Sequence, residues 1–178
     1  MENKRHILTC ESGHIEINGI SLGLSPKEFQ SALLEQGFTV IDKDDPIVLK
    51  GNIEGLGTCF VKLFGTKGSE TDGVSLVIVI TERKYNEDEM IAVFHQMEED
   101  LPGNALYDDG GYGVRPKPNE INHFWDLDQG YVTIQWDGYN YSRGNEPNFP
   151  KGDGLDQIAI WLRKPLIKDE AYWRSEVD

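Results

Sequence analysis

The chain reads SPKEFQSALLEQG over residues 25–37, and this stretch has the marks of a capped amphipathic helix. Ser25 can accept hydrogen bonds from first-turn amides, Glu28 completes a capping box, and Pro26 suits the first helical position. Apolar side chains then recur at helical spacing on one face, and Gly37 supplies a stop signal. The stretch therefore predicts a helix that packs one face against a core.

A second stretch of the same kind begins 61 residues later, where residues 86–101 read NEDEMIAVFHQMEEDL. Asn86 takes the place of Ser25, and Glu89 takes the place of Glu28. Apolar residues follow at spacings of three and four, before a Pro-Gly pair ends the run. The chain thus carries two predicted helices with the same start signal.

Each predicted helix is followed by four runs that are rich in β-branched and aromatic residues and separated by Gly, Asp or Pro. The first four runs are Phe38–Asp42, Ile47–Glu54, Thr58–Thr66 and Val74–Arg83. The second four are Ala105–Asp108, Ile121–Leu127, Tyr131–Tyr139 and Leu155–Arg163. This order predicts an α+β fold of two tandem units, each a helix packed on a four-stranded antiparallel sheet. Two unrelated segments that converge on a common order of elements are the alternative.

The repeat also predicts how the chain is divided. We expect an N-terminal strand segment (1–24), a first unit (25–85), a second unit (86–164) and a C-terminal tail (165–178). No run of 18 apolar residues is present, so no membrane-spanning helix is expected. No apolar stretch follows the charged N-terminus, which favours a cytoplasmic protein, or an exported one if a leader has been removed.

Charge is divided unevenly along the chain. The formal net charge is -14, with -3 in residues 1–85 and -11 in residues 86–178. Such a field repels nucleic acid and anionic membranes, and it favours a partner with a basic surface. An acidic surface that only maintains solubility is the alternative.

Strand alternation separates two faces of the second unit, because a helix can cover only one face of a sheet. The apolar set should face the helix: Ile121, Trp125, Leu127, Val132, Ile134, Trp136, Ile158, Ile160 and Leu162. The opposite set is aromatic and polar: Phe124, Tyr131, Thr133, Gln135, Tyr139, Tyr141 and Trp161. In the first unit the corresponding face is predicted to hold Val48, Lys50, Asn52, Phe60, Lys62, Phe64, Ser75, Val77 and Val79.

Aromatic side chains with polar tips dominate protein interfaces, so the opposite set predicts a partner-binding surface. The predicted partner-binding residues are Phe124, Tyr131, Gln135, Tyr139, Tyr141 and Trp161. A second reading is that the C-terminal tail folds back and covers this face with its own apolar residues, Leu166, Tyr172 and Trp173.

Three stretches resemble the β-lactamase inhibitor protein family and its PepSY-like relatives. They are a short strand with Gly before the capped helix (Gly19–Phe29), the Gly-Phe exit (Gly37–Phe38) and a hairpin with Gly (Lys50–Gly55). The resemblance implies two sheets side by side that form a concave protein-binding surface. Because Cys10 and Cys59 cannot supply a bridge within each unit, inhibition of a β-lactamase in particular is not implied.

No pattern of catalytic residues or metal ligands emerges. The four histidines lack a metal spacing, and an isolated His123 on a strand is usually structural. The Asp-rich stretch 126–130 suits a hairpin turn better than a calcium loop. We therefore expect a protein that binds other proteins, has no enzymatic activity and uses no cofactor.

The rival function is the binding of a small molecule or glycan, or weak hydrolysis, in the long loops 109–120 and 140–154. Clustered aromatic and polar groups there could converge on a ligand: Tyr112, Arg115, Tyr141, Arg143 and Asp153. A third possibility, a scaffold within an assembly, requires a stable oligomer.

Overall fold

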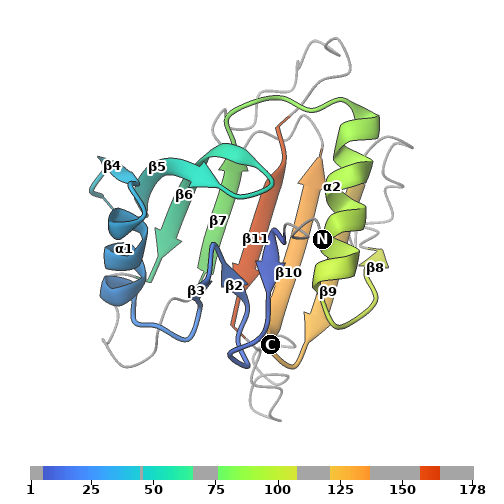
Figure 1. The fold of residues 1–178 in the computed structure, drawn as a ribbon, viewed down its shortest axis with the longest axis horizontal. Helices are drawn as coiled ribbons and strands as arrows, with labels where there is room; N and C mark the ends of the chain where they lie inside the picture. The colour runs from blue at the N-terminus through green and yellow to red at the C-terminus, as the bar shows by residue number, and fades with distance from the viewer. Residues whose placement is uncertain (1–5, 45, 66–75, 108–120, 137–156, 165–178) are drawn as a thin grey trace, which may run out of the picture.

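One large antiparallel sheet forms the centre of the molecule. The computed structural model describes residues 6–44, 46–65, 76–107, 121–136 and 157–164. Within them, the large sheet has eight strands in the order β4-β5-β6-β7-β11-β10-β9-β8 (Figure 1). Their bounds are β4 Thr39–Asp42, β5 Ile47–Ile53, β6 Gly57–Phe64, β7 Leu76–Thr81, β8 Leu106–Tyr107, β9 Ile121–Leu127, β10 Gly130–Trp136 and β11 Ala159–Arg163.

The two predicted helices and the antiparallel α+β class are confirmed, and each of the eight predicted strand runs overlaps a strand. The expectation of two separate four-stranded sheets is wrong. β7 and β11 pair antiparallel from Leu76↔Arg163 to Ile80↔Ala159, so the strands of both halves form one sheet. Both strands carry large apolar residues on their two faces, and pairing keeps them away from an exposed edge. Thr81 extends the junction, because its Oγ1 accepts a hydrogen bond of 2.9 Å from the backbone N of Ile158.

Both helices begin as the sequence predicts. α1 (Pro26–Glu35) and α2 (Glu87–Asp100) each have a complete capping box. In α2, Asn86 Oδ1 accepts from Glu89 N at 2.9 Å, and Glu89 Oε2 accepts from Asn86 N at 3.0 Å. The hydrogen bond from the Asn86 backbone stabilises the charged carboxylate, which lowers the pKa of Glu89. In the described part of the chain neither helix is long and apolar enough to cross a membrane.

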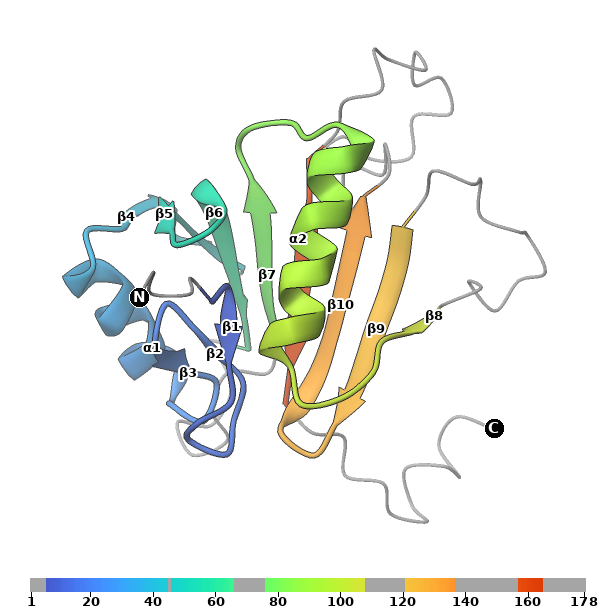
Figure 2. The same ribbon diagram turned by 45° about the vertical axis from the view of Figure 1, so that its right-hand side comes forward.

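The N-terminal segment forms a second, three-stranded sheet of β1 (Leu8–Thr9), β2 (Glu16–Ile17) and β3 (Ile20–Ser21). Asn18 and Gly19 both have positive φ, 51° and 72°, as a tight hairpin turn between β2 and β3 requires. α1, this small sheet and α2 all lie against the same face of the large sheet (Figures 1 and 2). Six apolar residues of the segment are buried in the core: Ile7, Leu8, Ile15, Ile17, Ile20 and Leu22.

The core fills the space between this cover and the inner face of the large sheet. The predicted inward set of the second half is confirmed for Trp125, Val132, Ile134, Ile158, Ile160 and Leu162, all of them buried. The side chains of Ile121 and Trp136 lie outside the described residues. In the first half the assignment of Val77 and Val79 to the outer face is wrong, since both are core residues. β7 reads Leu-Val-Ile-Val-Ile, so both of its faces are apolar and alternation cannot say which one points inward.

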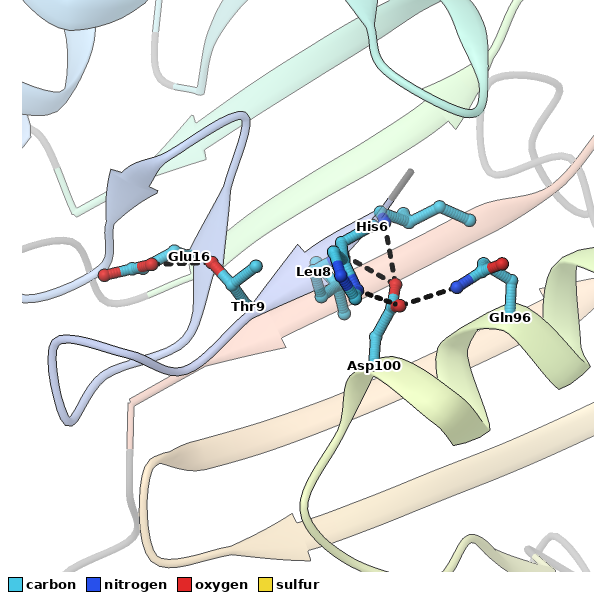
Figure 3. A network of polar contacts seen from close by, with 7 residues as sticks. His6, Leu8, Thr9, Glu16, Gln96 and Asp100 are labelled. Carbon is cyan, nitrogen blue, oxygen red and sulfur yellow. Dashed lines mark hydrogen bonds and ion pairs between the residues drawn. The ribbon is translucent and has the colours of Figure 1, made fainter. Parts of the chain in front are cut away.

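A buried carboxylate fastens the N-terminal segment to the last turn of α2 (Figure 3). Asp100 Oδ2 accepts from the backbone N of Ile7 at 2.7 Å and of Leu8 at 3.1 Å. Its Oδ1 accepts from Gln96 Nε2 at 2.7 Å and lies 2.8 Å from His6 Nδ1. The Asp100 side chain is fully buried, whereas that of His6 is 44 % exposed. These contacts make the carboxylate a structural anchor for β1.

Candidate functional site: the outer sheet face

The candidate site is the face of the large sheet opposite the two helices and the small sheet, which we call the outer face. Strand registers place its side chains in rows that run across the strands. The middle row contains Asp42, Val48, Lys62, Ile78, Trp161, Thr133 and Phe124. The row on one side contains Lys50, Phe60, Ile80, Ala159 and Gln135, and the row on the other side contains Phe64, Leu76, Arg163, Tyr131 and Asp126.

Four of the predicted partner-binding residues share this face. Phe124 and Trp161 lie in one row on either side of Thr133, while Tyr131 and Gln135 occupy the flanking rows. The rings of Phe124 and Tyr131 stack, with centroids 5.5 Å apart and an interplanar angle of 22°. The register thus gathers these residues on β9, β10 and β11 into one patch.

The remaining predicted site residues lie outside the described residues. They are Tyr139 and Tyr141 of the partner-binding set, and Tyr112, Arg115, Arg143 and Asp153 of the alternative ligand site. The same holds for the tail, residues 165–178, so its predicted cover of the outer face stays a prediction.

The patch is half-buried. Phe124, Tyr131, Gln135 and Trp161 are all neither fully buried nor fully exposed. Between them and β6 lie Ile78 and Ile80, which are only 5 % and 8 % exposed although they stand outside the main core cluster. The middle of the outer face is therefore a closely packed apolar floor with aromatic side chains beside it.

The outer sets predicted from the sequence omit several residues of these rows: Asp42, Leu76, Ile78, Ile80, Asp126, Ala159 and Arg163. Ile78 and Ile80 are absent because the predicted alternation of β7 places Val77 and Val79 on the outer face instead. Arg163 could have been found, because it is two residues after Trp161 on the same strand and so shares its face.

Cations flank the aromatic residues of this face. Lys50 Nζ lies 5.4 Å from the centroid of the Phe60 ring and forms an ion pair of 2.6 Å with Glu82. The guanidinium carbon of Arg163 lies 5.8 Å from the Trp161 ring centroid. Distances of this size allow cation–π attraction, which holds the charged groups beside the rings.

The histidine and cysteine side chains do not assemble a catalytic centre in the described residues. His123 stands on the inner face and stacks on Phe94 with centroids 4.3 Å apart, whereas Asp126, three positions on, belongs to the outer face. Burial raises the pKa of Cys59 to about 12, with a contribution from nearby Glu82, and burial also raises the pKa of Cys10. Both shifts disfavour a nucleophilic thiolate. No group of three His, Cys, Asp or Glu among the described residues is placed to hold a metal ion.

A hollow of about 780 Å³ lies at the end of the β5–β6 hairpin, away from the aromatic patch. Arg83 lines it, but its guanidinium carbon sits 3.7 Å from the Tyr85 ring centroid and its Nη1 lies 3.4 Å from Glu89. The hydroxyl of Tyr85 donates to the Leu56 carbonyl at 2.9 Å. These side chains are engaged in holding the hairpin against the start of α2.

The chain matches no protein-family profile, no curated protein and no solved structure. Its function is therefore inferred from the geometry of the outer face.

Proposed function

We infer that this protein is a non-enzymatic binding module that captures a protein or peptide on the outer face, chiefly over β9, β10 and β11. The observation that carries this proposal is the row of Phe124, Thr133 and Trp161, with Tyr131 stacked beside Phe124. Antiparallel sheets with one face in water usually alternate apolar and charged residues, and a half-buried aromatic patch departs from that rule. Such patches suit partners because aromatic rings bury large areas with little loss of side-chain entropy.

The order of the strands supports a tandem arrangement of two helix-plus-four-strand units. In each half a helix precedes four strands, and each half contributes its last strand, β7 or β11, to the centre of the sheet. Two related units joined antiparallel at their last strands would produce this mirrored order. The likeness to the β-lactamase inhibitor protein family implies tandem units of this kind, although with two sheets side by side, and in that family the sheet surface binds protein.

The edges of the sheet favour face binding over the addition of a partner strand. β4 has four residues, with a register shift between Val40 and Asp42, and β8 has two. Short strands, bulges and charged residues protect an edge from pairing with another chain. The broad surface left for a partner is the outer face.

The test is a selection of peptides from a random display library on the full-length protein, followed by titration of the labelled peptides. We expect Phe124→Ala and Trp161→Ala each to weaken binding about tenfold or more, as interface anchors do. Ile41→Ala is the matched control, because Ile41 is 53 % exposed and lies on β4. Melting temperatures should stay within a few degrees of the wild type. Selected peptides that bind both aromatic variants as well as the wild type would refute the proposal.

A further inference from the structure

The outer face carries cations although the chain as a whole is acidic. The formal net charge is -14, yet the described rows of this face contain three cations, Lys50, Lys62 and Arg163. Of these, Lys50 is matched by the carboxylate of Glu82 at 2.6 Å. Two carboxylates of the described strands lie in these rows: Asp126, opposite Tyr131 in the β9–β10 register, and Asp42, which pairs with Val48 and so lies in the row of Lys62. A partner that docks here therefore meets charges of both signs in the described rows.

Two of these cations lack a carboxylate partner among the described residues. Within the described ranges, neither the ammonium of Lys62 nor the guanidinium of Arg163 forms an ion pair. Lys62 stands two strands from Trp161 in the same row, and Arg163 stands two residues along β11 from Trp161. Strand spacing of about 4.8 Å and a rise of about 3.3 Å per residue put their Cα atoms about 12 Å apart. Trp161 stands at the corner between the two cations, about 10 Å from Lys62 across the strands and about 7 Å from Arg163 along β11.

The charges of Lys62 and Arg163 determine which groups a partner must supply. A docked surface that removed water from Lys62 and Arg163 without supplying counter-charges would incur a large desolvation penalty. Carboxylates on the partner offset that penalty, and an apolar side chain between them can pack on Trp161 and Ile78. In an extended peptide, carboxylates four residues apart lie on the same face and span about 13 Å, close to the separation of the two cations.

We propose that the partner of the outer face is an extended acidic peptide segment whose carboxylates pair with Lys62 and Arg163 around an apolar residue seated on Trp161. This inference rests on the proposed function and fixes the charge of its partner. It reverses the sign expected from the net charge alone, because short-range pairing at two sites decides docking while the distant acidic groups are screened by salt.

A nucleic acid fits these observations less well than a peptide. It too would supply anions and bases that stack on aromatic rings. A polyanion, however, carries a charge at every few ångströms and meets the -14 field over its whole length. A peptide with two carboxylates avoids most of that repulsion.

The test uses three pools of fluorescein-labelled ten-residue peptides that are identical except at two positions four apart. These positions hold Glu, Gln or Lys, with randomised apolar residues between them, and a ten-nucleotide oligothymidylate is the fourth probe. We expect the Glu pool to bind the full-length protein about tenfold more tightly than the Lys pool. Lys62→Glu with Arg163→Glu should invert that preference. Lys27→Glu, an exposed site on α1, is the matched control and should leave it unchanged.

The outcomes distinguish failure of the charge inference from failure of the proposed function. If the Glu and Lys pools bind alike, or if the reversal variant keeps the preference, the charge inference is wrong. Loss of binding in Trp161→Ala would then still uphold the proposed function, and the display-selected peptides are the positive control for it. Tighter binding of the oligothymidylate than of the Glu pool would also overturn the inference. If the reversal variant does not fold, Lys62→Gln with Arg163→Gln gives the same comparison by loss of the preference for Glu.

Discussion

Cys59 couples stability to pH at the scale of a single residue. It is fully buried, its Sγ lies 3.5 Å from the Gly57 carbonyl, and its pKa is raised from 9.0 to about 12 by burial. The unfolded thiol ionises near its ordinary pKa, whereas the folded thiol stays neutral. The stabilising contribution is therefore complete below about pH 9 and is lost as the pH rises toward 12.

Because the Cys59 thiol ionises in the unfolded state but stays neutral in the folded state, we expect the free energy of unfolding to fall by about 1.4 kcal/mol between pH 8 and pH 10. Urea unfolding of the wild type and of Cys59→Ala at both pH values measures it. The variant should be less stable at pH 8 because of its cavity, but it should lose less stability on going to pH 10. Equal losses in the two proteins would show that the thiol does not titrate as described.

The sequence predicts the inner face of a strand well where one set of alternate residues is apolar and the other set is polar. Val132 and Ile134 alternate with Tyr131, Thr133 and Gln135, so the phase of β10 can be read from the sequence and is confirmed. The same reasoning fails for β7, because Val77 and Ile78 are equally apolar and differ only in the face of the sheet on which they lie. The composition of a central strand buried on both sides holds no information on its phase.

At the scale of elements, the hydrogen bonds of the buried Asp100 carboxylate connect β1 to α2. A carboxylate in the last turn of a helix is unfavourable to the helix dipole, and α2 has no basic residue there to compensate. The backbone amides of Ile7 and Leu8 supply the compensation. Such long-range pairing cannot be predicted from the sequence, where Glu98, Glu99 and Asp100 look like three equivalent surface acids.

Asp100→Ala should leave two amide donors unsatisfied and lower the unfolding free energy by about 3 kcal/mol. This corresponds to a fall in melting temperature of about 10 °C. Glu35→Ala is the matched control, since Glu35 is an exposed carboxylate in the last turn of α1 and its removal should change stability little. Hydrogen exchange adds a local measurement, in which the amides of Ile7 and Leu8 should lose protection before those of β10. Unchanged protection of the Ile7 and Leu8 amides in Asp100→Ala would contradict the role of the Asp100 carboxylate in holding β1.

At the scale of the whole molecule, the sequence predicts the eight strands but not the sheet they form. Turn residues and alternation act within a few positions, and they define strands and hairpins such as β5–β6 and β9–β10. The pairing of β7 with β11 joins residues about eighty positions apart. Nothing local specifies it, apart from the apolar character that makes both strands unsuited to an edge.

This junction should make the two halves unfold as one cooperative unit. Trp125, Trp136 and Trp161 lie in the second half and Trp173 follows in the C-terminal tail, so no tryptophan is in the first half; fluorescence then omits the first half, while far-ultraviolet circular dichroism reports on both. Leu63→Ala removes a fully buried side chain of the first half and should cost about 2 to 5 kcal/mol. If β7 and β11 bind the halves together, the urea midpoint should fall by the same amount with both probes. A fluorescence midpoint that stays in place while the dichroism becomes biphasic would mean that the halves unfold separately.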